Sequence, residues 1–137
     1  MIKIFISGSE KNAPKDFTSW RDKVKNLCAW NDDTLQVLDP VTHFNYHDKP
    51  PRTPRQCFNY FMWLIDQCDV LLVNLDHSDA SVGTGCEVQH AYDRNKPIIG
   101  FGQDVLTWYE WTDEKCDVIF NTMEEAIEYI LANYVDL

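Results

Sequence analysis

The sequence predicts an α/β fold in which a parallel sheet of about five strands lies between layers of helices. Short apolar runs rich in β-branched residues alternate along the chain with segments of helical spacing. This alternation is typical of parallel strands joined by helical crossovers. The chain has 137 residues, of which 45% are hydrophobic, enough for one packed core. We therefore expect a single domain over residues 1–137.

Two strands and two helices are expected in the first half of the chain. Residues 2–7 predict a first strand, placed centrally, and residues 35–40 predict a second. Residues 14–31 predict an amphipathic helix. A helix is also expected from Thr53 to about Cys68, because proline at position 54 favours a helix start. Residues 41–55 predict a loop that closes over a ligand or packs against a second subunit. The side chains expected to be buried on the second helix are Cys57, Tyr60 or Phe61, Leu64 and Ile65.

The middle of the chain predicts a strand, a glycine loop, a helix and another strand. Residues 70–75 form a short apolar run that predicts a buried strand. A polar loop over 76–81 leads to Gly83-Thr84-Gly85, and the helix is expected directly afterwards, over 86–92. Residues 98–101 predict the next buried strand. Such a βαβ unit binds ligands at the turn that follows its first strand.

This turn predicts a site for an anionic or sugar-like ligand. Gly83 and Gly85 let the backbone approach a ligand closely, and Ser81 and Thr84 add hydroxyl donors. Glu87 is expected in the first turn of the helix, beside the pocket, where the helix terminus stabilises its anion. It could then act as a nucleophile or bind sugar hydroxyls. Alternatively, Glu87 only complements the helix dipole. The third glycine of a dinucleotide-binding motif is missing.

The two ends of the chain contribute further elements. Ser7-Gly8-Ser9 predicts a turn at the carboxyl end of the first strand, where open α/β sheets bind ligands. Residues 108–111 form an aromatic cluster that either packs over the sheet edge or provides a stacking surface for a base. Residues 117–120 predict the last strand. Thr122 and Glu125 have the spacing of a capping box that begins the final helix.

Composition excludes several classes of function. The net charge of −10 opposes binding of a nucleic-acid polymer, although it leaves a small nucleotide possible. No apolar run reaches the length of a membrane helix and no signal segment is evident, so we expect a cytoplasmic protein. His43 and His47 lie in a proline-containing loop that disfavours a metal pair. The five cysteines contain no C-x-x-C pair and predict reduced, mostly buried thiols. We expect no metal and no cofactor.

Three stretches carry a resemblance to a known family: D-V-L-L-V-N-L at 69–75, S-V-G-T-G-C-E-V-Q-H-A-Y at 81–92 and N-K-P-I-I-G-F at 95–101. They resemble the nucleoside 2-deoxyribosyltransferase family and its relatives, the deoxynucleoside 5′-monophosphate N-glycosidases. The resemblance implies a three-layer Rossmann/flavodoxin-like domain. It also implies that Glu87 attacks the anomeric carbon of the deoxyribose and holds the sugar as a glycosyl ester.

The resemblance assigns further residues around the sugar. Ser81 and Thr84 with the backbone of Gly83 and Gly85 would hold the 5′ group, and Ser7, Gly8 and Ser9 would form the opposite wall. Transferases of free nucleosides have an aspartate six residues before the nucleophile, where this chain has Ser81, as the monophosphate-cleaving relatives do. Asp79 could still turn into the site. The family also has an aspartate in the preceding helix, and the matching residues 59–61 contain no acid.

The resemblance further implies a homodimer or a higher homo-oligomer. A neighbouring subunit completes the site in this family, and Asn121 and Thr122 are the candidates here, unless they only cap the last helix. We therefore expect an enzyme that cleaves the N-glycosidic bond of a 2′-deoxyribonucleoside or its 5′-monophosphate, with transfer to another base or to water. Two alternatives remain: a non-catalytic nucleotide-binding module, and an N-glycosidase of another nucleotide such as NAD.

Overall fold

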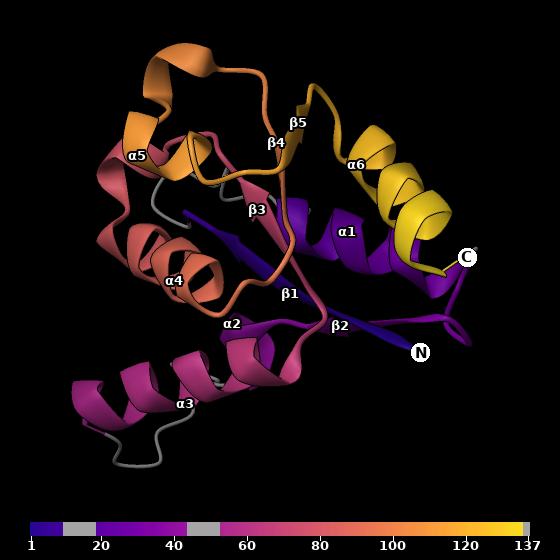
Figure 1. Ribbon diagram of the computed structural model, residues 1–137, viewed down its shortest axis with the longest axis horizontal. Helices are drawn as coiled ribbons and strands as arrows, with labels where there is room; N and C mark the ends of the chain where they lie inside the picture. The colour runs from indigo at the N-terminus through magenta and orange to yellow at the C-terminus, as the bar shows by residue number, and fades with distance from the viewer. Residues whose placement is uncertain (10–18, 44–52, 136–137) are drawn as a thin grey trace.

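The chain folds around a five-stranded sheet, seen in a computed structural model that describes residues 1–9, 19–43 and 53–135 (Figure 1). Every pairing is parallel and the strand order is β2-β1-β3-β4-β5. This is the flavodoxin-like doubly wound order, so the predicted fold class is confirmed. The strands are β1 (Ile2–Gly8), β2 (Leu35–Leu38), β3 (Val70–Asn74), β4 (Ile98–Phe101) and β5 (Val118–Phe120).

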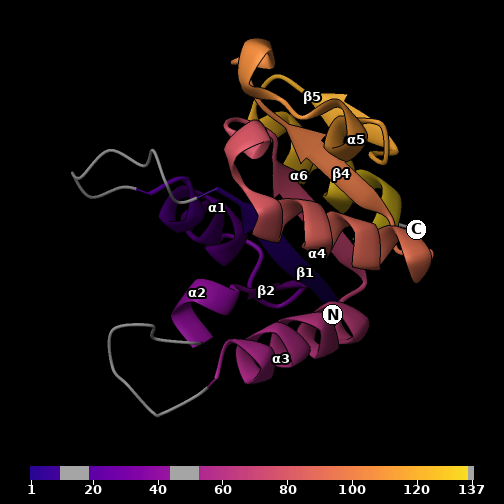
Figure 2. The same ribbon diagram turned by 90° about the vertical axis from the view of Figure 1, so that its left-hand side faces the viewer.

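Helices cover both faces of the sheet. Figure 1 shows α3 and α4 on one side and α1 and α6 on the other, and Figure 2 shows α4 crossing in front of the strands. The helices are α1 (Trp20–Ala29), α2 (Pro40–His43), α3 (Pro54–Gln67), α4 (Val82–Asp93), α5 (Glu110–Asp113) and α6 (Met123–Ile130). Three short turns complete the described chain: η1 (Ser78–Ala80), η2 (Val105–Thr107) and the π-helical η3 (Leu131–Val135).

Alternate residues of the strands supply two core clusters. Ile4 and Ile6 of β1 pack under α1 and α6, whereas Phe5 packs under α3 and α4. All five residues of β3 are buried, as expected for the middle strand of a sheet with both faces covered. The first strand was predicted to be central, and β1 lies one strand away from the centre, between β2 and β3.

Two helices differ from the prediction. Helix α1 begins at Trp20, after its N-cap Ser19, and ends at Ala29, whereas the helix was predicted over 14–31; residues 14–18 lie outside the described residues. On α3 the buried side chains are Met62, Leu64 and Ile65, and Cys57, Tyr60 and Phe61 are only half-buried. The prediction of a buried Cys57 is therefore wrong, and Tyr60 and Phe61 pack against the core cluster only in part.

The predicted loop over 41–55 begins with the short helix α2, and residues 44–52, with His47, lie outside the described residues. All five cysteines have free thiols: Cys28 and Cys68 are buried, and Cys86 is exposed. Among the helices of the described ranges, none has the length and apolarity needed to cross a bilayer.

Candidate active site

Helix α4 begins earlier than the sequence predicts. Ser81 is its N-cap: the backbone is extended there, and the hydroxyl oxygen accepts a hydrogen bond from the N–H of Thr84 at 3.3 Å. The Ser81 hydroxyl also lies 2.7 Å from the Thr84 hydroxyl. Gly83 and Gly85 therefore lie within the first turn of the helix, and the predicted glycine loop before it is wrong. A good N-cap outweighs the low helix propensity of two glycines.

Glu87 consequently lies in the second turn of α4, not the first, and only 8% of the residue is exposed. It faces the carboxyl end of β1, where the Ser7 hydroxyl donates a 2.7 Å hydrogen bond to Glu87 Oε1. The sequence places Ser7 and Glu87 eighty residues apart, and the fold brings their side chains into contact.

Burial determines the protonation of Glu87. Desolvation raises the pKa of its carboxyl from 4.5 to about 7, and the nearby Asp39 carboxylate acts in the same direction. The hydrogen bond from Ser7 and the positive charge of Arg21 oppose this rise. Burial therefore opposes the anion that the helix terminus was expected to stabilise, and it leaves Glu87 partly protonated near neutral pH.

Arg21 and Asp39 are two further buried charged residues near Glu87 that were not predicted from the sequence. They are 4% and 3% exposed, and Arg21 Nη1 lies 2.9 Å from Asp39 Oδ1. Lys25 Nζ lies 2.6 Å from Asp39 Oδ2. The position of Asp39 at the carboxyl end of a predicted strand was the available signal, since strand carboxyl ends line the sites of open α/β sheets.

The predicted residues at and just after the end of β1 are enclosed. Ser7 is fully buried, and Ser9 is 9% exposed. A Cβ atom added to Gly8 would lie 2.5 Å from Trp20 Cζ2, so the strand passes close to the indole ring at this position. The carboxyl ends of β1 and β3 lie side by side at this edge of the sheet, because Gly8 pairs with Asn74.

At the start of α4, Gly83 leaves room for a ligand. A Cβ atom added there would meet nothing within 4 Å, and the residue is exposed. Residues four apart share one side of a helix, so this open space lies on the side of α4 that carries Glu87. Thr84 is buried, and its hydroxyl is paired with that of Ser81.

Neither Asp79 nor Asn121 forms a hydrogen bond with Glu87 within one chain. Asp79 belongs to η1, is exposed, and faces a groove on the outer side of α4. Asn121 follows β5 and is exposed. Because β5 is the third strand from β1, Asn121 lies roughly 14 Å along the sheet from Ser7 at typical strand spacing.

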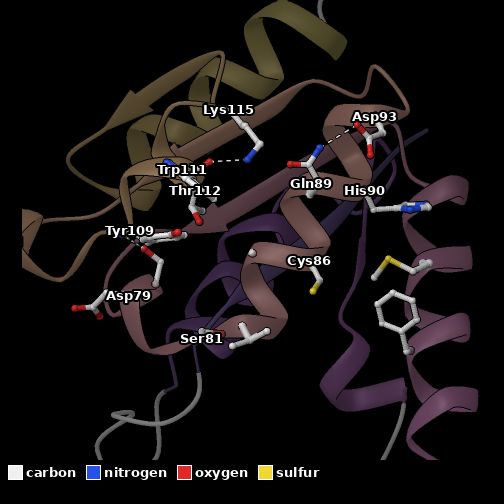
Figure 3. Close-up of a pocket in the computed structure, with 15 residues that line it drawn as sticks. Asp79, Ser81, Cys86, Gln89, His90, Asp93, Tyr109, Trp111, Thr112 and Lys115 are labelled. Atoms are coloured by element: carbon white, nitrogen blue, oxygen red, sulfur yellow. Dashed lines mark hydrogen bonds between the residues drawn. The ribbon is translucent and has the colours of Figure 1, made fainter.

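That outer groove, about 650 Å³ in volume, runs between α3, α4 and α5 (Figure 3). Of the predicted site residues, Asp79, Ser81 and Gly85 line it, while Glu87 and Ser7 do not. Its remaining lining residues are Phe58, Met62, Ser78, Val82, Cys86, Gln89, His90, Asp93, Tyr109, Trp111, Thr112 and Lys115.

The aromatic cluster over 108–111 divides between two environments. Trp108 is half-buried, packs against the core cluster under α3 and α4, and donates through Nε1 to Asp76 at 3.0 Å. The rings of Tyr109 and Trp111 lie 5.7 Å apart and form one wall of the outer groove (Figure 3). Packing over the sheet edge thus accounts for Trp108, and the other two rings remain accessible for stacking.

The fold and the site define a class: a doubly wound α/β protein with a buried glutamate aimed at the carboxyl end of β1. The model of the nucleoside 2-deoxyribosyltransferase family matches residues 4–123. The chain therefore belongs to the nucleoside 2-deoxyribosyltransferase family, as the resemblance implied.

Two solved structures are similar to this chain. A conserved protein from Enterococcus faecalis V583 superposes with a TM-score of 0.74 at 16% identity, over 96% of this chain and 98% of that one. The 2-deoxyribosyltransferase from the psychrotolerant bacterium Bacillus psychrosaccharolyticus superposes with a TM-score of 0.67 at 16% identity, over 95% and 93%. At this identity the likeness concerns the fold alone. No curated protein sequence matches the chain significantly.

Proposed function

We propose that this protein cleaves the N-glycosidic bond of a 2′-deoxyribonucleoside or its 5′-monophosphate, and transfers the deoxyribose to another base or to water. The observation that carries the proposal is the Glu87 carboxyl, buried in the second turn of α4 and fixed by the Ser7 hydroxyl at the carboxyl end of β1. Membership of the family supplies the class of reaction.

In the first step the Glu87 carboxylate attacks C1′ as the bond from C1′ to the base nitrogen breaks. The base leaves with the bonding electron pair and takes up a proton, and the sugar becomes a glycosyl ester of Glu87. Ser7 holds Oε1, which leaves Oε2 to form the new bond. In the second step a base nitrogen or water attacks C1′, loses its proton, and releases the carboxylate.

The nucleophile must be ionised, and this requirement sets the pH dependence. With a pKa of about 7, Glu87 is only partly ionised in the free enzyme at neutral pH. On this proposal kcat/KM rises with pH through that value, since kcat/KM reports the free enzyme. The buried carboxylate is poorly solvated, which suits a nucleophile that must lose its water before attack.

The start of α4 supports a 5′-monophosphate as the preferred substrate. The N–H groups of Val82 and Gly83 have no acceptor within α4 and favour an anion, whereas the N–H of Thr84 is capped by Ser81. Ser81, six residues before Glu87, adds a hydroxyl where a carboxylate would repel phosphate. Asp79 lies on the outer side of α4, facing the groove.

The test is incubation of the protein with the deoxynucleosides and their 5′-monophosphates, with and without an acceptor base, read by chromatography. We expect free base from the wild type and none from Glu87→Gln. Asp93→Asn is the matched control, because Asp93 is an exposed carboxylate on the outer side of the same helix. Base release that persists in Glu87→Gln would show that another group is the nucleophile.

One observation favours a second candidate, a nucleotide-binding module without turnover. Residues 59–61 of α3, which match the region of the family's further aspartate, are Asn-Tyr-Phe and supply no carboxylic acid to protonate the leaving base. Calorimetric titration with deoxynucleoside 5′-monophosphates distinguishes the two candidates. Tight binding with no base released over hours supports the module and contradicts the enzyme.

A further inference from the structure

The carboxyl end of β1 extends beyond the strand that pairs with it on one side. The register between β1 and β2 ends at Phe5 and Leu38, whereas the register between β1 and β3 continues to Gly8. The N–H of Ile2 donates to Thr34 O, on the side of β2. Successive residues of a strand point their N–H and C=O groups to opposite sides, so every second residue points to the same side. The carbonyl groups of Ile6 and Gly8 therefore point to the side of β2, at a level where β2 has already ended.

Arg21 supplies the donors that β2 does not. Its Nη1 donates to Ile6 O at 3.2 Å and its Nη2 donates to Gly8 O at 2.9 Å. One guanidinium therefore binds the two carbonyl groups on either side of Ser7. Trp20 covers the same group, with Arg21 Cζ lying 4.6 Å from the centre of its ring.

The same arginine links β1 to a buried carboxylate. Nη1 also donates to Asp39 Oδ1 at 2.9 Å, and this oxygen accepts from the N–H of Val41 at 3.1 Å. A planar guanidinium with five N–H donors can bind three acceptors at fixed angles, which an ammonium group cannot do. Arg21 thus joins the end of β1, the residue after β2 and its own helix α1.

Among the described residues, the groups that act on the Glu87 carboxyl come from three elements. β1 contributes the Ser7 hydroxyl, α1 contributes the positive charge of Arg21, and the segment after β2 contributes the negative charge of Asp39. Lys25 on α1 forms an ion pair with the other carboxylate oxygen of Asp39, Oδ2.

We propose that Arg21 is a positioning residue of this site. By holding the backbone on both sides of Ser7, it fixes the hydroxyl that orients Glu87, and together with Asp39 it balances the charge around the carboxyl. Orientation for catalysis rests on the proposed function, whereas the charge balance is a property of the protein with or without turnover. A stabilising role alone explains the arrangement less well, since a buried ion pair contributes little net stability.

The first test does not depend on activity. The side-chain carboxyl of Glu87 is titrated by NMR in protein labelled with ¹³C at glutamate Cδ, and its signal is assigned by its loss in Glu87→Gln. We expect the midpoint to rise by about one pH unit in Arg21→Met and to fall by a similar amount in Asp39→Asn, the size typical of a nearby charge. Arg94→Met is the matched control, because Arg94 pairs with Asp66 at the surface and should leave the midpoint unchanged.

The second test separates position from charge. Arg21→Lys keeps the positive charge but loses the forked geometry, so we expect a midpoint that rises less than in Arg21→Met, with kcat lowered about tenfold or more and KM little changed. Thermal unfolding of each variant verifies that the protein is folded. Asp39→Asn and Arg21→Lys each keep a polar group at the substituted position and are therefore expected to fold. If Arg21→Met does not fold, these two variants still test the proposal by titration and by kcat.

The outcomes distinguish this proposal from the proposed function. If the midpoint moves in the same direction in Arg21→Met and Asp39→Asn, or in neither, or if Arg21→Lys keeps full kcat, the role of Arg21 is wrong. If the wild type releases no base, the proposed function fails, and the titration still decides whether Arg21 and Asp39 set the charge at Glu87.

Discussion

Replacing Glu87 by glutamine should stabilise the protein, and should do so only as the pH rises. Glutamine has nearly the shape of the protonated carboxyl and keeps an oxygen that can accept from the Ser7 hydroxyl. Unlike glutamate, it never has to ionise in a site from which water is almost excluded. The comparison therefore isolates the free energy of placing a charge at this position.

The size of the effect follows from the pKa of Glu87, which burial raises from 4.5 to about 7. A group whose pKa is raised on folding stabilises the protein fully below its unfolded pKa, and this contribution is lost as the pH rises through the folded pKa. At about 1.4 kcal/mol per pKa unit, the loss amounts to about 3 kcal/mol, most of it between pH 5 and pH 8. Glu87→Gln escapes this loss.

The measurement is urea unfolding of both proteins at pH 5, 6, 7 and 8. We expect the free energy of unfolding of Glu87→Gln to exceed that of the wild type by a margin that grows by about 2 to 3 kcal/mol over this range. A hydrogen bond that the glutamine amide forms or fails to form changes this difference in free energy of unfolding by the same amount at every pH. Glu128→Gln, at an exposed position of α6, gives the effect of losing one surface carboxylate, which is subtracted. A margin that stays constant with pH would refute the reasoning from burial.

Three further predictions follow from the same contacts. Ser7→Ala removes a hydrogen bond that lowers the pKa of Glu87, so the acid limb of the kcat/KM profile for base release should move to higher pH and kcat should fall. Gly8→Ala places a Cβ 2.5 Å from Trp20 Cζ2 and should lower the free energy of unfolding by roughly 1–3 kcal/mol in urea titrations. Gly83→Ala meets no atom within 4 Å and should raise it by roughly 0.5–1 kcal/mol, while its methyl group raises KM for the proposed substrate.

The strands could be predicted closely from the sequence because their signals are local. β3 and β4 are short apolar runs bounded by polar residues and a proline, and nothing else in the fold competes for them. The start of α4 was misplaced because two glycines favour a loop by propensity, whereas the Ser81 cap and burial of Thr84 decide the outcome. Capping is visible in sequence, but its strength relative to the glycines depends on tertiary packing.

The candidate site could be predicted only in part, for a different reason. Glu87 and Ser7 belong to recognisable sequence motifs at the ends of two strands, but the hydrogen bond between them was not predicted. Arg21 was missed because a charged residue on an amphipathic helix normally faces solvent. Its burial depends on the length of β2. The last residue of β2 pairs with Phe5, and β1 continues for three more residues to Gly8. The sequence of α1 contains no local pattern from which this difference in length could be predicted.

The ending of β2 also explains why a charged site can form in a sheet otherwise covered on both faces. Arg21 comes from α1 in one helical layer, and Glu87 comes from α4 in the other (Figure 1). Side chains from opposite layers are normally separated by the sheet between them. Where β1 continues past β2, that barrier is missing on one side, so the guanidinium reaches the carbonyl groups that β2 does not bind, and its charge acts on the Glu87 carboxyl. The end of β1 that binds Arg21 is thus also the place where the charge of Arg21 acts on Glu87. Lengthening β2 would remove the binding of Arg21 to β1 and its effect on Glu87.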